Sequence, residues 1–224
     1  MDAPLRVREP AQARSKRTRE ALLVAGAVEF SELGYARTTT KSIAERAGVA
    51  TGSFYQYFVD KDALLRELAV ERQVKVAADV LAVVTLPARG SVPSRPGAAQ
   101  LKMQIAAIVE LVMRAHREDP NLHAVLTERR YADRELDASS AVGERALCDA
   151  IAAMLRCWAF VGDSPAVAFV LFSMCEGAVH GHVLGQPVVS DVRFTRALVD
   201  ALICVISRGP SKGRVATPKS KERS

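Results

Sequence analysis

The chain has 224 residues, which is enough for one or two domains with a sizeable hydrophobic core. No stretch approaches the roughly 18 uncharged apolar residues that a membrane-spanning helix needs. The N-terminus carries charges but no apolar segment, which argues against a secretory signal. We therefore expect a cytoplasmic protein without a membrane contact, whose four cysteines are buried, reduced thiols; redox sensing is the alternative.

The net charge of +6 is unevenly distributed along the chain. Residues 1–19 carry a net charge of +4 and residues 208–224 carry +5, so the part between them carries −3. The positive charge is therefore concentrated at the two ends. We interpret residues 1–14 as a disordered basic arm and residues 208–224 as a disordered basic tail, which can also serve solubility alone.

Two short helices joined by a tight turn are predicted between Thr39 and Lys61, after a first helix from about Ser15 to Leu33. Thr39 or Thr40 can cap the first of the two. Gly48 ends it, because glycine adopts a left-handed backbone at a helix end with little steric cost.

The second short helix, Thr51–Tyr57, has small residues in its first turn and aromatic residues after them. A helix tip without bulky side chains can approach another surface closely, and its N–H groups favour an anion there. This arrangement is typical of a helix-turn-helix that reads DNA with its second helix. The basic side chains Arg14, Lys16 and Arg17 precede it and can contact phosphates.

One set of positions in this stretch follows a recognisable pattern. The positions are Thr40, Lys41, Ser42, Ile43, Ala44, Ala47, Gly48, Val49, Gly52, Ser53, Phe54, Tyr55, Tyr57, Phe58, Lys61, Leu64 and Leu65. The pattern resembles the DNA-binding domain of TetR-family transcriptional regulators. Its ending, G-x-x-Y-x-Y-F-x-x-K, is more specific than a helix-turn-helix pattern alone, and the resemblance covers about residues 15–65.

The resemblance implies a homodimer that binds a palindromic operator, with repression as the expected polarity. The residues expected at DNA are Thr40, Lys41, Thr51, Gly52, Ser53, Tyr55, Gln56, Tyr57 and Lys61. Phosphate contacts are expected from Thr40, Tyr55, Tyr57 and Lys61, and base contacts from Lys41, Thr51 and Gln56. The alternative for Tyr55 is burial between the helices.

Helical periodicity continues through the rest of the chain. A long helix is predicted from Lys61 to about Val84, followed by a proline-rich loop. Further helices are predicted at about 98–117, 120–131, 134–160, 164–184 and 191–207. The predicted fold is all-α, with an N-terminal three-helix helix-turn-helix head at residues 15–60 and a C-terminal helical ligand-binding and dimerisation body at residues 61–207.

The last two predicted helices, 164–184 and 191–207, are apolar on more than one face. Such helices must be buried on several sides, and a second copy of the chain can bury them. A core position within a monomer is the alternative. The resemblance also implies a dimer through these helices.

The body carries methionines and aromatic residues with few polar neighbours. As a set they would line a mostly apolar pocket for a small hydrophobic effector, although each can equally be plain core. The residues are Met103, Met113, Tyr131, Trp158, Phe169, Phe172 and Met174.

The sequence offers no catalytic constellation, phosphate-binding loop or zinc signature. His180 and His182 are two residues apart, so on a helix they point in different directions. We therefore expect no enzyme activity, no cofactor and no metal. The alternative function is a small-molecule-binding helical protein, or an enzyme, with a vestigial DNA-binding head.

Overall fold

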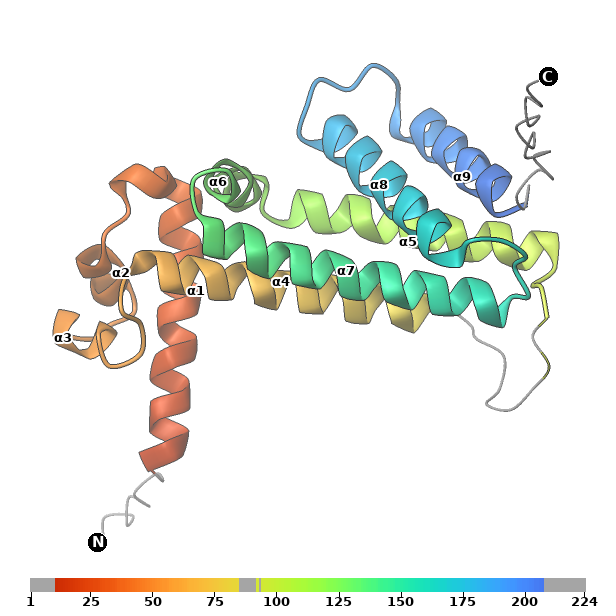
Figure 1. Ribbon diagram of the computed structural model, residues 1–224. Helices are drawn as coiled ribbons and strands as arrows, with labels where there is room; N and C mark the ends of the chain where they lie inside the picture. Colours follow the sequence, from red (N-terminus) through yellow and green to blue (C-terminus); the bar gives the residue numbers. More distant parts are fainter. Residues whose placement is uncertain (1–10, 85–91, 93, 208–224) are drawn as a thin grey trace, which may run out of the picture. The chain divides into compact units, whose positions relative to one another are not determined.

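A computed structural model describes residues 11–84, 92 and 94–207. All regular secondary structure in these residues is α-helical, which confirms the predicted all-α fold (Figure 1). The proposed arm and tail fall largely outside the described residues. The helices are α1 Ala11–Arg37, α2 Thr40–Arg46, α3 Thr51–Phe54, α4 Lys61–Val83, α5 Ala98–Glu118, α6 Pro120–Arg130, α7 Arg134–Cys157, α8 Ser164–Val183 and α9 Asp191–Ser207.

The chain divides into two compact units. The head unit comprises Met1–Leu81 and Leu111–Arg145, and the body unit comprises Ala82–Glu110 and Ala146–Ser224. The division therefore passes through α4, α5 and α7. The sequence predicted a head that ends at residue 60. In the structure, α6 and the first part of α7 belong to the same unit as the helix-turn-helix.

The head unit has one hydrophobic core that joins four consecutive helices to α6. Side chains that are 5% exposed or less come from α1, from the helix-turn-helix and from α4. Leu122 and Val125 of α6 complete the core from a distant part of the sequence. The residues of this core are Leu22, Leu23, Ala25, Phe30, Ile43, Ala44, Phe54, Phe58, Leu64, Leu65, Leu68, Leu122 and Val125.

Helix α1 begins at Ala11, earlier than predicted, and is interrupted at Gly34. The φ of Gly34 is 74° and its ψ is 170°, a conformation that a residue with a Cβ rarely adopts. The chain turns here as predicted, and the residues after Gly34 lead into α2. The position of Tyr35 follows from this break.

Helices α8 and α9 lie side by side in the body unit (Figure 1). His182 Nε2 lies 2.9 Å from Asp191 Oδ1, and its ring stacks on Phe194 with 4.0 Å between the ring centres. His182 is buried. It therefore joins the two helices, which accounts for a histidine that the sequence left without a role.

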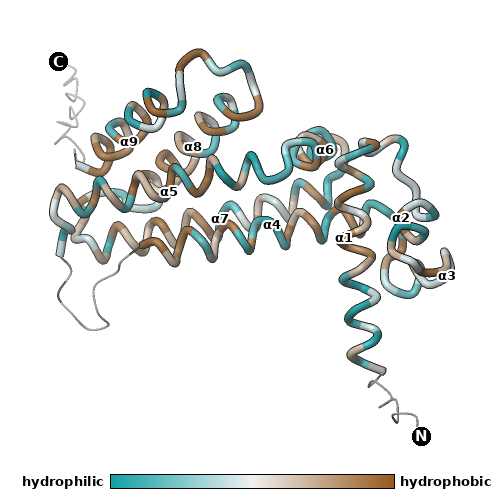
Figure 2. The backbone as a smooth tube through the Cα atoms, turned by 180° about the vertical axis from the view of Figure 1, so that it is seen from behind, coloured by the Kyte–Doolittle hydropathy of each residue, from teal (hydrophilic) through white to brown (hydrophobic). Residues whose placement is uncertain are grey.

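A ridge of exposed small and apolar residues runs along α8. Phe169 is 61% exposed, and Ser173, Gly177 and Gly181 follow at intervals of four residues, all exposed. A Cβ added at Gly177 or at Gly181 would meet no atom within 4 Å. Hydrophobic residues along α8 and α9 are visible in Figure 2. Among the described residues, packing does not require a glycine at either position.

The expectation that no segment resembles a membrane span is wrong for α8. By length and composition Ser164–Val183 is apolar enough to cross a membrane, and little of it is buried in the described structure. The sequence estimate counted unbroken apolar runs, whereas α8 intersperses apolar residues with serine, glycine and histidine.

The cysteines only partly match the expectation of burial. All four are free thiols. Three of them are half-buried, namely Cys148, Cys157 and Cys175, and Cys204 is exposed. Burial raises the pKa of the Cys175 thiol to about 12, which keeps it protonated and unreactive. The expectation fails for Cys204, whose side chain lies on the solvent side of α9.

Two helices end in the same hydrogen-bonded turn with different residues at its centre. After α2, Gly48 N donates to Glu45 O and Val49 N to Ala44 O, and Gly48 has a φ of 71°. After α7, Ala159 N donates to Arg156 O and Phe160 N to Leu155 O, and Ala159 has a φ of 54°. Both are Schellman motifs, but the second holds an alanine in the left-handed region.

At the two Schellman turns, an alanine-to-glycine exchange and a glycine-to-alanine exchange should change the stability in opposite directions. Ala159→Gly relieves a left-handed alanine and should stabilise the body unit by about 0.5 to 1 kcal/mol after the added chain entropy of glycine. Gly48→Ala should destabilise the head unit by about 1 kcal/mol or more. Scanning calorimetry of both variants tests this. A lowered unfolding temperature for Ala159→Gly would contradict it.

Candidate nucleic-acid interface

The start of α2 is fixed by a capping box. Thr39 Oγ1 accepts from Ser42 N at 3.0 Å, and Thr39 N donates to Ser42 Oγ at 3.2 Å. Thr39 is therefore the cap, one of the two predicted candidates. The side chain of Thr40 is left to pair with Tyr55, with 3.0 Å between their hydroxyl oxygens.

Helix α3 is shorter than the predicted Thr51–Tyr57. Regular α-helix ends at Phe54, and the chain continues in tight turns in which Gln56 N donates to Ser53 O and Tyr57 N to Phe54 O. Phe54 is fully buried and Phe58 is 5% exposed. These two rings anchor the segment; between them Tyr55 and Gln56 face outward, whereas Tyr57 packs partly against the core.

The exposed side of this segment carries polar side chains. Tyr55 is 56% exposed, so it is not buried between the helices, which was the alternative. Exposed residues of the predicted set are Lys41, Gly52, Tyr55 and Gln56; half-buried residues are Thr40, Thr51, Ser53, Tyr57 and Lys61. The head thus brings the predicted residues together on α2, α3 and the turn before α4.

Gly52 lies on this exposed side without a packing role. A Cβ added there would meet no atom within 4 Å, and its φ is not in the left-handed region. Neither the backbone geometry nor packing against the residues that the structure describes requires glycine here. Close approach by an external surface would require it.

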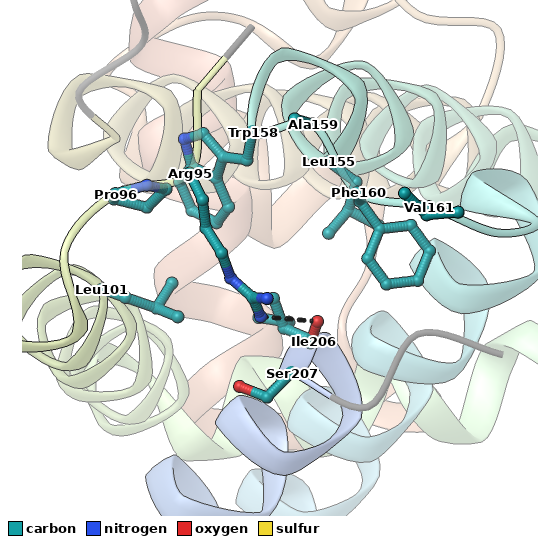
Figure 3. A pocket seen from close by; sticks show the side chains of 10 residues that line it. All are labelled: Arg95, Pro96, Leu101, Leu155, Trp158, Ala159, Phe160, Val161, Ile206 and Ser207. Carbon is teal, nitrogen blue, oxygen red and sulfur yellow. Dashed lines mark hydrogen bonds between the residues drawn. The ribbon is translucent and has the colours of Figure 1, made fainter. Parts of the chain in front are cut away.

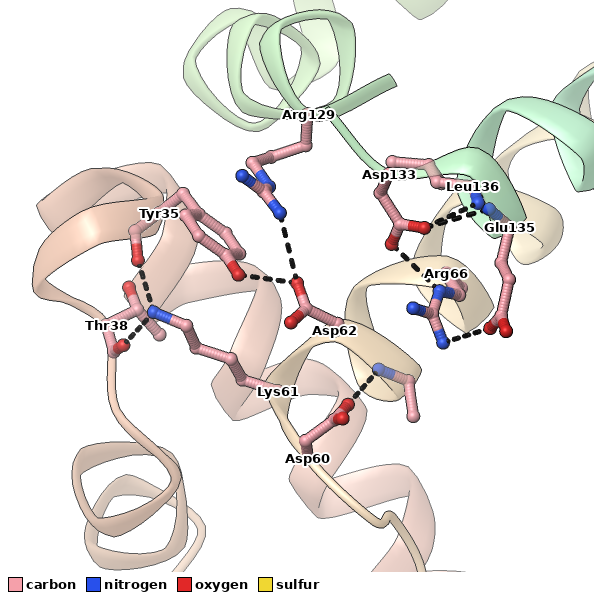
Figure 4. A network of polar contacts seen from close by, with 11 residues as sticks. Tyr35, Thr38, Asp60, Lys61, Asp62, Arg66, Arg129, Asp133, Glu135 and Leu136 are labelled. Carbon is pink, nitrogen blue, oxygen red and sulfur yellow. Dashed lines mark hydrogen bonds and ion pairs between the residues drawn. The ribbon is translucent and has the colours of Figure 1, made fainter. Parts of the chain in front are cut away.

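Lys61 does not simply extend into solvent. Its Nζ donates to Tyr35 O and Thr38 O, each at 2.8 Å, and lies 4.0 Å from the centre of the Tyr35 ring (Figure 4). Burial lowers its pKa. Two of the three ammonium donors are therefore engaged inside the head, and the predicted phosphate contact depends on the third.

Tyr35 connects the start of α4 to α6. The Arg129 guanidinium lies 3.8 Å from the Tyr35 ring centre, and Figure 4 shows the ring close to both cations. Tyr35 Oη donates to Asp62 Oδ1 at 2.6 Å, and the same carboxylate lies 3.7 Å from Arg129 Nη2. Burial, with this hydrogen bond, raises the pKa of Tyr35 to about 12.

A second ion-pair group extends this attachment. Arg66 Nε of α4 donates to Asp133 Oδ2 at 2.9 Å, and Asp133 Oδ1 accepts from the backbone N of Glu135 and of Leu136 at the start of α7 (Figure 4). Hydrogen bonds from Arg66 and these amides outweigh burial and lower the pKa of Asp133. The start of α4 is thus held by both α6 and α7.

Helix α2 is held on α1 by Arg46. Its Nε donates to Glu29 Oε1 at 2.6 Å, and Glu29 is 5% exposed. Hydrogen bonding by Ser42 and Arg46 lowers the pKa of Glu29 against the effect of burial. This part-buried pair holds α2 against α1.

The structure does not gather the predicted effector residues around one pocket. Met103 is 68% exposed, Tyr131 90% and Phe169 61%, so their side chains face outward. Met113 is buried in the head unit. Phe172 and Met174 are half-buried, and Trp158 is buried beside a cavity described below. The choice of methionines and aromatic residues identified apolar side chains without showing what covers them.

Gln104 of α5 is a feature that the sequence analysis missed. The residue is 4% exposed, and neither its Oε1 nor its Nε2 has a hydrogen-bond partner among the described residues. A buried amide without partners costs about 1 to 3 kcal/mol. The sequence signal that could have revealed this buried amide is a polar residue within the apolar stripe of Leu101, Ile105 and Val109.

Comparisons with known proteins agree on one family. Residues 22–68 match the family described as "Bacterial regulatory proteins, tetR family". Residues 101–208 match the family described as "Tetracyclin repressor-like, C-terminal domain". No curated protein matches the chain.

Solved structures of regulators share the fold. A TetR-family regulator from Mesorhizobium loti is 18% identical, with 87% of this chain and 97% of that one covered and a TM-score of 0.71. SmeT, the repressor of the Stenotrophomonas maltophilia efflux pump SmeDEF, is 22% identical, with coverages of 92% and 98% and a TM-score of 0.61. The fatty acid degradation regulator FadR from Bacillus halodurans is 18% identical, with coverages of 91% and 98% and a TM-score of 0.61.

The unpartnered amide leads to a stability prediction. Gln104→Met keeps a similar volume and removes the buried polar atoms, so it should stabilise the body unit by about 1 kcal/mol or more. Thermal unfolding of the purified protein measures this. Gln104→Glu is the matched contrast, because it buries a charge and should lower the unfolding temperature. A lower unfolding temperature for Gln104→Met would contradict the inference that the amide of Gln104 makes no stabilising hydrogen bond.

Proposed function

Because the chain belongs to the TetR family of bacterial regulatory proteins, we propose that it is a transcriptional repressor that binds a palindromic operator as a homodimer and is released by a small, mostly apolar effector. The observation that carries this proposal is the exposed tip of α3. It presents small and polar residues outward, held by two buried phenylalanines.

The proposed DNA contacts follow from the arrangement of this tip. Gly52 permits close approach, and the exposed Tyr55 and Gln56 present a phenol and an amide to a phosphate and a base edge. Lys41 is exposed and its Nζ lies 3.7 Å from Glu45 Oε1, an exposed pair that is weak enough to release the cation. Thr40, Thr51, Ser53, Tyr57 and Lys61 complete the proposed contact surface.

The exposed ridge on α8 supports the proposed homodimer. Two glycines one turn apart, Gly177 and Gly181, leave the helix backbone open, so a second α8 can approach closely. Phe169 and Val170 add apolar surface at the N-terminal end of the ridge. A partner helix would cover apolar residues that a monomer leaves in water, and α9 would contribute beside it.

The same ridge is relevant to whether the protein lies in a membrane or in the cytoplasm. An apolar helix that is poorly buried in one chain can face lipid or a second chain. Charged residues on the solvent side of the neighbouring α9, including Arg193, Arg196 and Asp200, favour the second chain. We accordingly propose a cytoplasmic protein without a membrane contact, as for the regulators of this family.

The effector would act through α4. This helix begins at Lys61, directly after the proposed DNA-contacting segment, and runs to Val83, beyond the end of the head unit at Leu81. A ligand changes operator affinity only if it binds the two states with different affinity. The repressor polarity is supported by SmeT, a structural relative that is a repressor.

Gly52→Ala tests the DNA surface. The variant should fold with unchanged or slightly higher stability, because its Cβ meets no atom of the chain, and should bind DNA about tenfold more weakly or worse. The measurement is fluorescence anisotropy with the DNA fragment upstream of the protein's own gene at two salt concentrations. The dependence of the DNA-binding constant on salt concentration should be unchanged, since the substitution removes no charge.

Gly97→Ala is the matched control, since a Cβ there also meets no atom within 4 Å and Gly97 precedes α5 in the body unit. It should leave DNA affinity unchanged. If the unaltered protein bound the upstream fragment no better than an unrelated duplex at both salt concentrations, the head would be vestigial, and the alternative of a small-molecule-binding protein or enzyme would stand.

A double substitution, Gly177→Ala with Gly181→Ala, tests the dimer. Each exchange favours the helix by about 1 kcal/mol, so the subunit should remain folded. The added methyl groups should hold two α8 helices apart and weaken the dimer about tenfold or more. Sedimentation equilibrium measures the dissociation constant, with Gly97→Ala again as the control. An unchanged constant would place the interface elsewhere.

A further inference from the structure

A cavity of about 130 Å³ lies within the body unit, where the first turn of α5 meets the ends of α7 and α9 (Figure 3). An engineered cavity of about 150 Å³ in another protein binds benzene. The volume here is therefore suited to a single six-membered ring. Its walls include Leu101, Leu155, Trp158, Phe160 and Ile206.

Four of the residues that line the cavity are both apolar and buried. Leu101, Leu155, Trp158 and Ile206 are all 3% exposed or less. Trp158 and Phe160 are set on either side of Ala159, whose left-handed backbone closes the Schellman turn after α7. A strained alanine at this turn is a cost that the fold bears beside the cavity, and strain of this kind clusters at binding sites.

One cation faces this apolar space. Figure 3 shows the Arg95 side chain reaching toward Ile206, and Arg95 Nη2 donates to Ile206 O at 3.0 Å. The carbonyl belongs to the last turn of α9, where the helix dipole favours a positive charge. In the part of the chain that the structure describes, no carboxylate pairs with Arg95, and no residue lining the cavity is acidic.

A guanidinium has five N–H donors in a planar fork that matches a carboxylate. The carbonyl of Ile206 engages one nitrogen, so the remaining donors can serve a ligand. A cationic ligand would be repelled by Arg95, and a neutral ring would leave these donors without an anionic partner. A ring that carries one carboxylate satisfies both the apolar walls and the cation.

We propose that this cavity binds a small monocyclic carboxylate of the benzoate type, with the ring against Trp158 and Phe160 and the carboxylate on Arg95. The residues of this site all lie in the body unit, so binding of the acid can be measured without DNA. That such an acid is the effector rests on the proposed function, and it names the effector's chemical class as an organic acid with an apolar ring.

The test uses the tryptophan of the site as its own probe. Trp158 is the single tryptophan of the chain, so the intrinsic fluorescence reports on this cavity. Titration of the full-length protein with benzoate should change the fluorescence saturably and raise the unfolding temperature. Benzamide, which has nearly the same shape without the charge, should bind about tenfold more weakly or worse.

Substitutions of the exposed Arg95 complete the test. Arg95→Gln should reduce benzoate affinity to that of benzamide, and Arg95→Lys should retain part of it. Equal affinity for benzoate and benzamide, no saturable signal, or undiminished benzoate binding by Arg95→Gln would overturn the proposal. The titration contains no DNA, so its outcome is separate from that of the operator measurements. Release of the upstream fragment by benzoate then tests the role of effector.

Discussion

The head unit depends on the break in α1 at Gly34 and on the aromatic ring that follows it. The break exposes the carbonyl groups of Tyr35 and Thr38, and the Lys61 ammonium binds both. The same ring contacts Arg129 from α6. One tyrosine therefore joins the end of α1, the beginning of α4 and a helix from far along the sequence. This joint and the Arg46–Glu29 ion pair together hold the helix-turn-helix on α1.

The local features of the head were predictable because they depend on neighbouring residues. Thr39 caps α2 through Ser42, three residues away, and Gly48 ends the helix through bonds to Glu45 and Ala44. The spacing of Phe54 and Phe58 places both rings on the core side. These interactions span five residues or fewer, so a sequence pattern contains all the participants.

The long-range features were not predictable from one sequence. Nothing near Lys61 indicates that its ammonium turns back to α1, and nothing near Arg129 points to Tyr35. Residue type likewise marked Met103 and Phe169 as candidates for an apolar pocket, but it could not show that this chain leaves them exposed. The cavity beside Trp158 depends on Arg95 and Ile206, which are far apart in the sequence. Membership of a family supplies the fold of such a region without its side-chain contacts.

The hydrogen bond between Tyr35 and Asp62 has a consequence for how the head responds to its surroundings. With its pKa at about 12 against an unfolded value near 10, the phenol contributes stability at any pH below about 10 and loses it as the pH rises through 12. The Tyr35 phenol therefore keeps its proton at neutral pH and remains a hydrogen-bond donor to Asp62. A displacement of α6 would break the contacts of Arg129 with both Tyr35 and Asp62, and a displacement of α4 would break the contacts of Asp62 with Tyr35 and Arg129.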